Sequence, residues 1–105
     1  MPSDVAAGGG PSFDCNGDLD PAADVICRYP ALSGYDGAMG TLYARARKRG
    51  LDVQAAQREW LKDRDLACRP ARIDLNNPLA AANLGHCLAH FTRMRVDRLA
   101  ALLRD

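Results

Sequence analysis

From Phe13 to Arg104, apolar residues recur every three or four positions, which is the spacing of one face of an α-helix. No stretch shows the alternation of polar and β-branched residues that is typical of strands, and Ala, Leu, Arg and Asp dominate. The pattern therefore predicts an all-α fold, a small bundle of three to four helices.

Three prolines mark the starts of helices, because each follows a capping residue or a turn and proline is tolerated in the first helical turn. The helices predicted in this way span residues 21–28, 30–49 and 78–103. Gly50 is expected to end the second of them. Asp52 is expected to cap a further helix that runs to about Cys68, followed by a loop.

Projection at about 100° per residue gives each of the three longer helices an apolar face. The face of the second helix contains Leu32, Tyr35, Met39, Leu42, Tyr43 and Ala46. The face of the third contains Val53, Ala56, Trp60 and Ala67, with Gln57 and Arg64 in the same stripe. The face of the fourth contains Leu84, Leu88, Phe91, Leu99 and Leu102. We expect these faces to form the core.

Several polar or aromatic residues on these faces are predicted to be structural. Trp60 is expected to fill the core, with the stem of Arg64 over its ring and the guanidinium reaching a carboxylate. Arg95 falls inside the apolar face of the fourth helix, where a buried guanidinium requires a partner. Asp36 is the predicted partner, and Tyr43 is expected to pack on the same side of the second helix.

The opposite side of the second helix carries Gly34, Gly37 and Gly40. An interior glycine costs a helix about 1 kcal/mol relative to alanine. Two interpretations follow. The structural one is that a neighbouring segment packs closely on this side or that the helix is merely weak. The functional one is that this smooth side is a contact surface for a partner.

At 105 residues and a formal charge of +1, the chain fits one small domain, and its composition gives no case for a nucleic-acid footprint. The arginines of 45–49 and 58–72 are therefore interpreted as solvated helix ends. Residues 1–12 are Gly-rich and are predicted to form a flexible tail before a domain at 13–105. The sequence contains no run of about 18 apolar residues, so no membrane span is predicted.

Four cysteines without a CxxC pair favour two disulfides and an oxidising compartment. The N-terminus has neither the basic start nor the apolar run of a secretory signal, so we expect a mature form from which the signal is missing. His86 and His90 have the spacing of a zinc helix but lack its glutamate and project away from the apolar face. We expect no cofactor and no catalytic activity, because no nucleophile motif is present.

Five segments of the chain carry a resemblance to one family. They are FDC at 13–15, ADVIC at 23–27, PALSGYDGAMGTLYARA at 30–46, QREWLKDRDLAC at 57–68 and CLAHFTRMRVDRLAALL at 87–103. Together they resemble the four-cysteine secreted bacterial family named after the LprI lysozyme inhibitor. The most specific positions are Gln57, Trp60, Arg64, Asp65 and Cys68, and further agreement occurs at Asp36, Tyr43, Arg95 and Leu99.

The resemblance implies a helical module, stapled by disulfides and exported to the periplasm, envelope or medium of a bacterium. It implies the pairs Cys15–Cys27 and Cys68–Cys87, each of which would add about 3 kcal/mol in the chain-entropy picture. The second helix departs from the family pattern, which is usually leucine-rich where this chain has Tyr35 and the three glycines.

The leading functional hypothesis is a non-catalytic protein that binds a protein partner, with lysozyme inhibition by surface occlusion as its specific form. An inhibitor of a basic lysozyme is expected to present acidic surface. The complementary patch in this chain is predicted to be Asp14, Asp18, Asp20 and Asp24. One alternative is an envelope interaction module that uses the face of Gly34, Gly37 and Gly40 or the rings of Tyr29 and Tyr35. Another is a metal-binding protein that uses His86 and His90.

Overall fold

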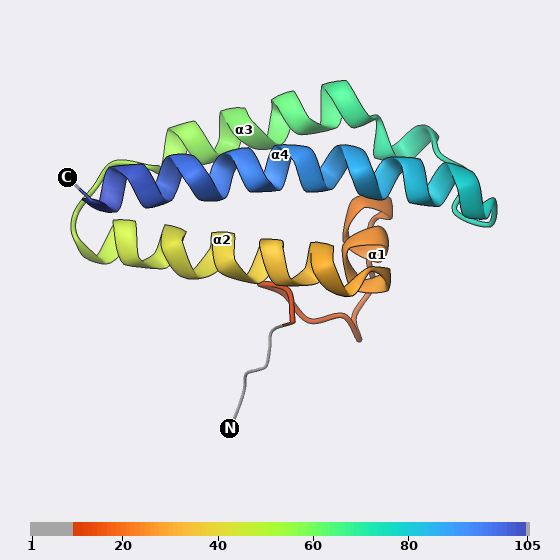
Figure 1. Cartoon of the computed structure of the whole chain (residues 1–105), viewed down its shortest axis with the longest axis horizontal. Coiled ribbons are helices and arrows are strands. Elements are labelled where there is room, and N and C mark those ends of the chain that lie inside the picture. The colour runs from red at the N-terminus through yellow and green to blue at the C-terminus, as the bar shows by residue number, and fades with distance from the viewer. Residues whose placement is uncertain (1–9, 105) are drawn as a thin grey trace.

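The computed structural model describes residues 10–104, which form four α-helices and one short 3-10 helix (Figure 1). The elements are α1 at Pro21–Arg28, α2 at Pro30–Lys48, α3 at Gln54–Cys68, η1 at Pro70–Arg72 and α4 at Pro78–Arg104. No strand occurs in this part of the chain, so the all-α prediction is confirmed. The predicted ends of the first, second and fourth helices differ from the observed ends by no more than one residue.

Three long helices lie roughly along the long axis of the molecule. Figure 1 shows that α2 and α4 run in the same direction, whereas α3 runs the opposite way along α4. The short α1 crosses the end of the bundle where α2 begins, and η1 lies near it. The last turn of α4 lies at the opposite end, beside the turn between α2 and α3.

The helix boundaries follow from local capping chemistry. The Asp20 carboxylate accepts a hydrogen bond from the backbone N–H of Ala23 at 2.8 Å, which caps α1. Asn77 caps α4 in the same way, with its side-chain oxygen 3.1 Å from two backbone nitrogens of the first turn. Gly50, with φ of 79°, ends α2 in the left-handed conformation that glycine adopts without steric cost.

Asp52 does not cap α3, contrary to the prediction. The helix begins at Gln54, and the preceding Val53 makes no side-chain capping bond. Val53 is instead buried in the core, and its carbonyl accepts the first helical hydrogen bond, from Gln57, at 2.9 Å. Burial of a valine side chain stabilises by about 1.5 kcal/mol or more, against about 1 kcal/mol for an exposed cap, so the core sets how the chain enters this helix.

The core consists of two clusters of buried apolar side chains. One lies at the α1 end and contains Ala22, Val25, Ile26, Leu32, Cys68, Leu84 and Leu88. The other lies further along the bundle and contains Met39, Ala46, Val53 and Leu99. Residues of all four α-helices or their flanks contribute, so the predicted apolar faces do meet in one interior.

Three residues that helical projection placed on core faces are exposed: Tyr35, Ala56 and Ala67. On α3, which packs mainly on α4, the buried face is narrow and these alanines lie at its edges. On α2, contacts with both α1 and α4 turn Ser33 inward, where its hydroxyl donates to the carbonyl of Ile26 at 2.5 Å.

Two disulfides fasten the ends of helices to one another. Cys15 in the loop before α1 pairs with Cys27 in α1, and Cys68 at the end of α3 pairs with Cys87 in α4. This is the pairing that the family resemblance implies, and all four cysteines are used in it.

The N-terminal part of the described chain lies against α2. Residues 1–9 of the predicted tail are outside the described residues, but residues 10–12 pack across α2 at Gly37 and Gly40. Both the backbone N–H and the hydroxyl of Ser12 donate to Asp36 at 2.7 Å. Residues 10–12, which belong to the predicted tail, are thus packed on α2.

Candidate interaction surface

The four aspartates of the predicted acidic patch lie around α1, but their carboxylates do different things. Asp20 caps the helix, and Asp24 accepts from Arg28 in an ion pair at 2.6 Å. Asp14 accepts only a backbone N–H two residues further on, at 2.9 Å, and Asp18 has no polar partner among residues 10–104. Asp14 and Asp18 are both exposed, so they are the two charges of this patch most open to a partner.

The small-residue side of α2 is largely covered by the chain itself. A Cβ atom added at Gly37 would collide with the backbone carbonyl oxygen of Gly10, and one at Gly40 would lie 2.7 Å from the Ser12 side chain. At Gly34 an added Cβ would meet no atom within 4 Å. Close packing of a neighbouring segment therefore accounts for Gly37 and Gly40, and only Gly34 is left open to a partner.

The predicted ion pair between Asp36 and Arg95 is wrong. Asp36 is only 4% exposed and is held by Ser12, whereas Arg95 donates from Nε to Oε1 of Gln57 at 2.7 Å. Burial, with a smaller contribution from the charge of Arg98, lowers the pKa of Arg95 below its ordinary value. Helical projection placed both Asp36 and Arg95 toward the interior, where they are buried, but α3 brings Gln57 to Arg95, and Asp36 lies where residues 10–12 cross α2.

Trp60 lies partly buried between α3 and α4, where contacts to its indole N–H and to the face of its ring hold it in place. Its indole N–H donates to the backbone carbonyl of Phe91 at 3.0 Å. The guanidinium of Arg64 pairs with Asp65 at 2.9 Å, a carboxylate partner as predicted, but it is the guanidinium itself, and not the predicted stem, that lies 5.5 Å from the ring centroid. Tyr43 packs against the second core cluster. These contacts place the chain's single tryptophan in the scaffold rather than on a binding face.

Both His86 and His90 are exposed on α4, and the ring of His90 packs edge-on against Phe91. Among the described residues, no group of three or more His, Cys, Asp or Glu side chains is arranged to hold a metal ion. The described helices also include none that is both long and apolar enough to traverse a bilayer.

A shallow hollow of about 210 Å³ lies between α2 and α4 and is lined by Tyr29, Tyr35, Gly85, His86 and nearby alanines. The absence of a side chain at Gly85 makes room for the ring of Tyr29, which would lie 3.3 Å from a Cβ there. Arg93 covers Tyr35 at 5.8 Å from the ring centroid. The rings of the alternative partner surface are therefore partly occupied by contacts within the chain.

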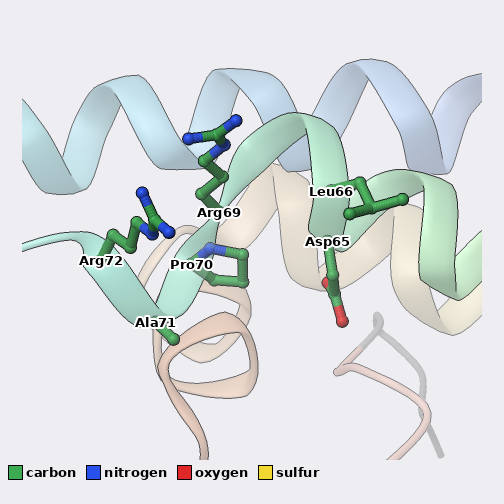
Figure 2. Close-up of a pocket in the computed structure, with 6 residues that line it drawn as sticks. All are labelled: Asp65, Leu66, Arg69, Pro70, Ala71 and Arg72. Carbon is green, nitrogen blue, oxygen red and sulfur yellow. The ribbon is translucent and has the colours of Figure 1, made fainter.

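A second hollow, of about 360 Å³, lies where α3 ends and η1 begins (Figure 2). We call it the α3–η1 corner; its lining residues are Asp65, Leu66, Arg69, Pro70, Ala71 and Arg72. Figure 2 shows the side chains of Arg69 and Arg72 on one side of the η1 ribbon, with the Asp65 carboxylate pointing the other way. Leu66 is 73% exposed, which leaves a large apolar side chain open to solvent beside two cationic groups.

The backbone of the α3–η1 corner is unusual at Arg69, which has φ of 48° and ψ of 57°. It is the only non-glycine residue with positive φ in residues 10–104. Glycine is the usual residue at the left-handed position that follows a helix. The predictions from sequence did not single out this corner. The feature that marks it is an arginine directly after the end of a helix and directly before a proline, and helical periodicity does not detect such a feature.

The comparisons with known proteins identify a family. The family model described as "Lysozyme inhibitor LprI" matches residues 15–99, most of the chain. No curated protein and no solved structure gives a significant match.

Proposed function

The chain belongs to the lysozyme inhibitor LprI family, and on this premise we propose that it is a non-catalytic protein that binds lysozyme and covers its substrate cleft. The observation that carries this proposal is the match over residues 15–99, which contains all four cysteines and the greater part of the helical bundle. The two disulfides suit an oxidising compartment, so the proposed site of action is the periplasm or the medium.

Inhibition by occlusion needs a rigid surface more than it needs reactive groups. Two disulfides and a core shared by four helices hold the backbone in place, which reduces the entropy lost when a complex forms. All four thiols are consumed in disulfides, so none is left to act as a nucleophile. These properties support a protein that blocks access to a cleft.

The proposed docking end of the molecule is the one that carries α1, the loop before it and η1 (Figure 1). Asp14 and Asp18 are exposed at this end and are not neutralised by a cation among the described residues. A basic lysozyme would be attracted to these carboxylates, and such attraction raises the association rate more than it changes the final affinity.

The experiment is a titration of the oxidised protein into a panel of lysozymes, with heat of binding and lysis of cell walls followed together. We expect saturable binding and a parallel loss of lysis for at least one member. The variant Asp14→Asn/Asp18→Asn should slow association by about tenfold at low salt.

The matched control is Asp63→Asn/Asp97→Asn, which removes the same charge from two exposed positions on α3 and α4. It should leave the association rate within about twofold of the unchanged protein. If the oxidised protein neither binds nor inhibits any lysozyme, the proposed function is wrong; if both double variants slow association equally, net charge and not this loop does the steering.

A further inference from the structure

We infer that the α3–η1 corner is the part of the surface that enters the partner's cleft, with Arg69 and Arg72 pairing with carboxylates inside it. This inference rests on the proposed function and names the group on lysozyme that is contacted. It is carried by four observations: two unpaired guanidinium groups, a fixed backbone, an exposed apolar neighbour, and the position of the corner at one end of the bundle.

The charges of Arg69 and Arg72 are available to a partner. Neither guanidinium has a hydrogen bond or an ion pair with any residue in 10–104. The acidic residue that lines the same hollow, Asp65, is already paired with Arg64 and points away from both arginines (Figure 2). The corner therefore presents two positive charges that the fold does not use.

The backbone that carries these arginines is held from both sides. Cys68 is tied to α4 by its disulfide, and the N–H of Arg69 donates to the Asp65 carbonyl at 2.9 Å. The N–H of Arg72 in turn donates to the Arg69 carbonyl at 3.0 Å, and Pro70 between them is buried. The backbone at these positions therefore loses little conformational freedom when the corner binds a partner.

Arg69 adopts the left-handed conformation although its Cβ makes that conformation sterically unfavourable. Glycine would adopt this conformation without steric cost. Strained non-glycine positions cluster at functional sites, and here the strained residue carries one of the corner's two guanidinium groups, neither of which has a polar partner in residues 10–104. An arginine at this position supplies a guanidinium that glycine lacks, and a functional role for that group would explain why arginine is found there.

The composition of the corner suits the centre of a protein interface. Arginine is enriched at energetically important interface positions, and Leu66 supplies an apolar contact beside the two cations. η1 lies at the end of the bundle away from the last turn of α4, so this corner can approach a concave partner end-on (Figure 1).

The chemistry of a lysozyme cleft matches these two cations. Glycoside hydrolases generally place a pair of carboxyl groups on either side of the scissile bond. A guanidinium forms two parallel hydrogen bonds to a carboxylate, a geometry that lysine cannot reproduce. Because η1 contacts α1, the acidic loop and the arginine corner share one end of the molecule. The acidic loop before α1 would face the basic rim of the lysozyme cleft, and the α3–η1 corner would face the carboxylates at the centre of the cleft.

The decisive comparison uses two double variants that remove equal charge from opposite ends of the bundle. Arg69→Ala/Arg72→Ala empties the corner, and Arg45→Ala/Lys48→Ala removes two cations from a hollow beside Leu103 at the other end. Long-range electrostatics predicts that either variant binds a basic lysozyme slightly better. We expect the opposite for the corner variant, a rise in Kd of about a hundredfold, because each lost charged hydrogen bond weakens binding about tenfold or more.

A second variant, Arg69→Gly, separates binding from folding, since glycine suits the left-handed backbone at this position. It should unfold at the same temperature as the unchanged protein or higher and still bind lysozyme about tenfold more weakly. A lysozyme whose general-acid glutamate is replaced by glutamine should lose affinity for the unchanged protein, and this loss should shrink when the corner variant is used.

The outcomes distinguish the two proposals. Binding by the unchanged protein together with equal binding by the corner variant and its control would overturn the corner assignment and leave the inhibitor function standing. Failure of the unchanged protein to bind any lysozyme would overturn both.

Discussion

Arg95 of α4 donates from Nε to the side-chain oxygen of Gln57 in α3 at 2.7 Å, and its Nη2 is buried with no hydrogen-bond partner in residues 10–104. This pair joins two helices through one neutral amide in place of a carboxylate. The charge is therefore only partly compensated, which agrees with a pKa of Arg95 that burial lowers.

The first prediction concerns this pair. Gln57→Ala should reduce the free energy of unfolding by about 2 kcal/mol, because a second polar atom of a buried guanidinium loses its partner. Urea unfolding measures the change. Gln54→Ala, at an exposed position on the same helix, should cost less than about 0.5 kcal/mol. The double variant Arg95→Met/Gln57→Leu should regain most of the lost stability; if it is as unstable as Gln57→Ala, the guanidinium is better compensated than its contacts indicate.

The second prediction compares two glycines one turn apart on α2. Gly34→Ala should stabilise the protein by up to about 1 kcal/mol, since helix propensity improves and an added Cβ meets no atom within 4 Å. Gly37→Ala should instead destabilise it by about 1–3 kcal/mol, because the methyl group displaces residues 10–12 and breaks the bonds from Ser12 to Asp36. Thermal and urea unfolding of both variants test this. Equal stabilisation would show that the packing of residues 10–12 contributes nothing.

A third prediction addresses the role of the indole N–H. Trp60→Phe should lower the free energy of unfolding by about 1 kcal/mol, the net value of its hydrogen bond to the Phe91 carbonyl. Trp60→Ala should cost about 3 kcal/mol, since the second core cluster and the guanidinium of Arg64 both lose a contact surface. If the phenylalanine variant were as stable as the unchanged protein, the ring would act by its bulk alone.

The fourth prediction ranks the two disulfides. Chain entropy assigns about 3 kcal/mol to each. Cys68→Ala/Cys87→Ala should cost more than Cys15→Ala/Cys27→Ala, because Cys68 belongs to the first core cluster whereas Cys15 is exposed. Chemical unfolding of the two double variants under oxidising conditions gives the difference. A larger loss from removal of the first disulfide would show that the loop before α1 is more important to the bundle than its burial suggests.

Much of the scaffold could be read from residue order because helix caps and apolar periodicity are local properties. Pro21, Pro30 and Pro78 each lie at the first position of a helix, as predicted. The apolar positions of α4 were predicted well, because this helix is long and its periodic signal is repeated over many turns. Asp52 was predicted less well, since a local capping preference was outweighed by burial of the neighbouring Val53.

The sequence by itself determined the all-α class, the boundaries of α1, α2 and α4 and most of the inward-facing positions of the long helices, because these depend on residues within a few positions of one another. Tertiary structure alone decided that Asp36 is held by Ser12, that Arg95 pairs with Gln57, and that residues 10–12 cover Gly37. Partners of this kind depend on how far each helix slides and rotates against its neighbours. That relative position is set by the packing of the whole core, so no local pattern of residues contains it.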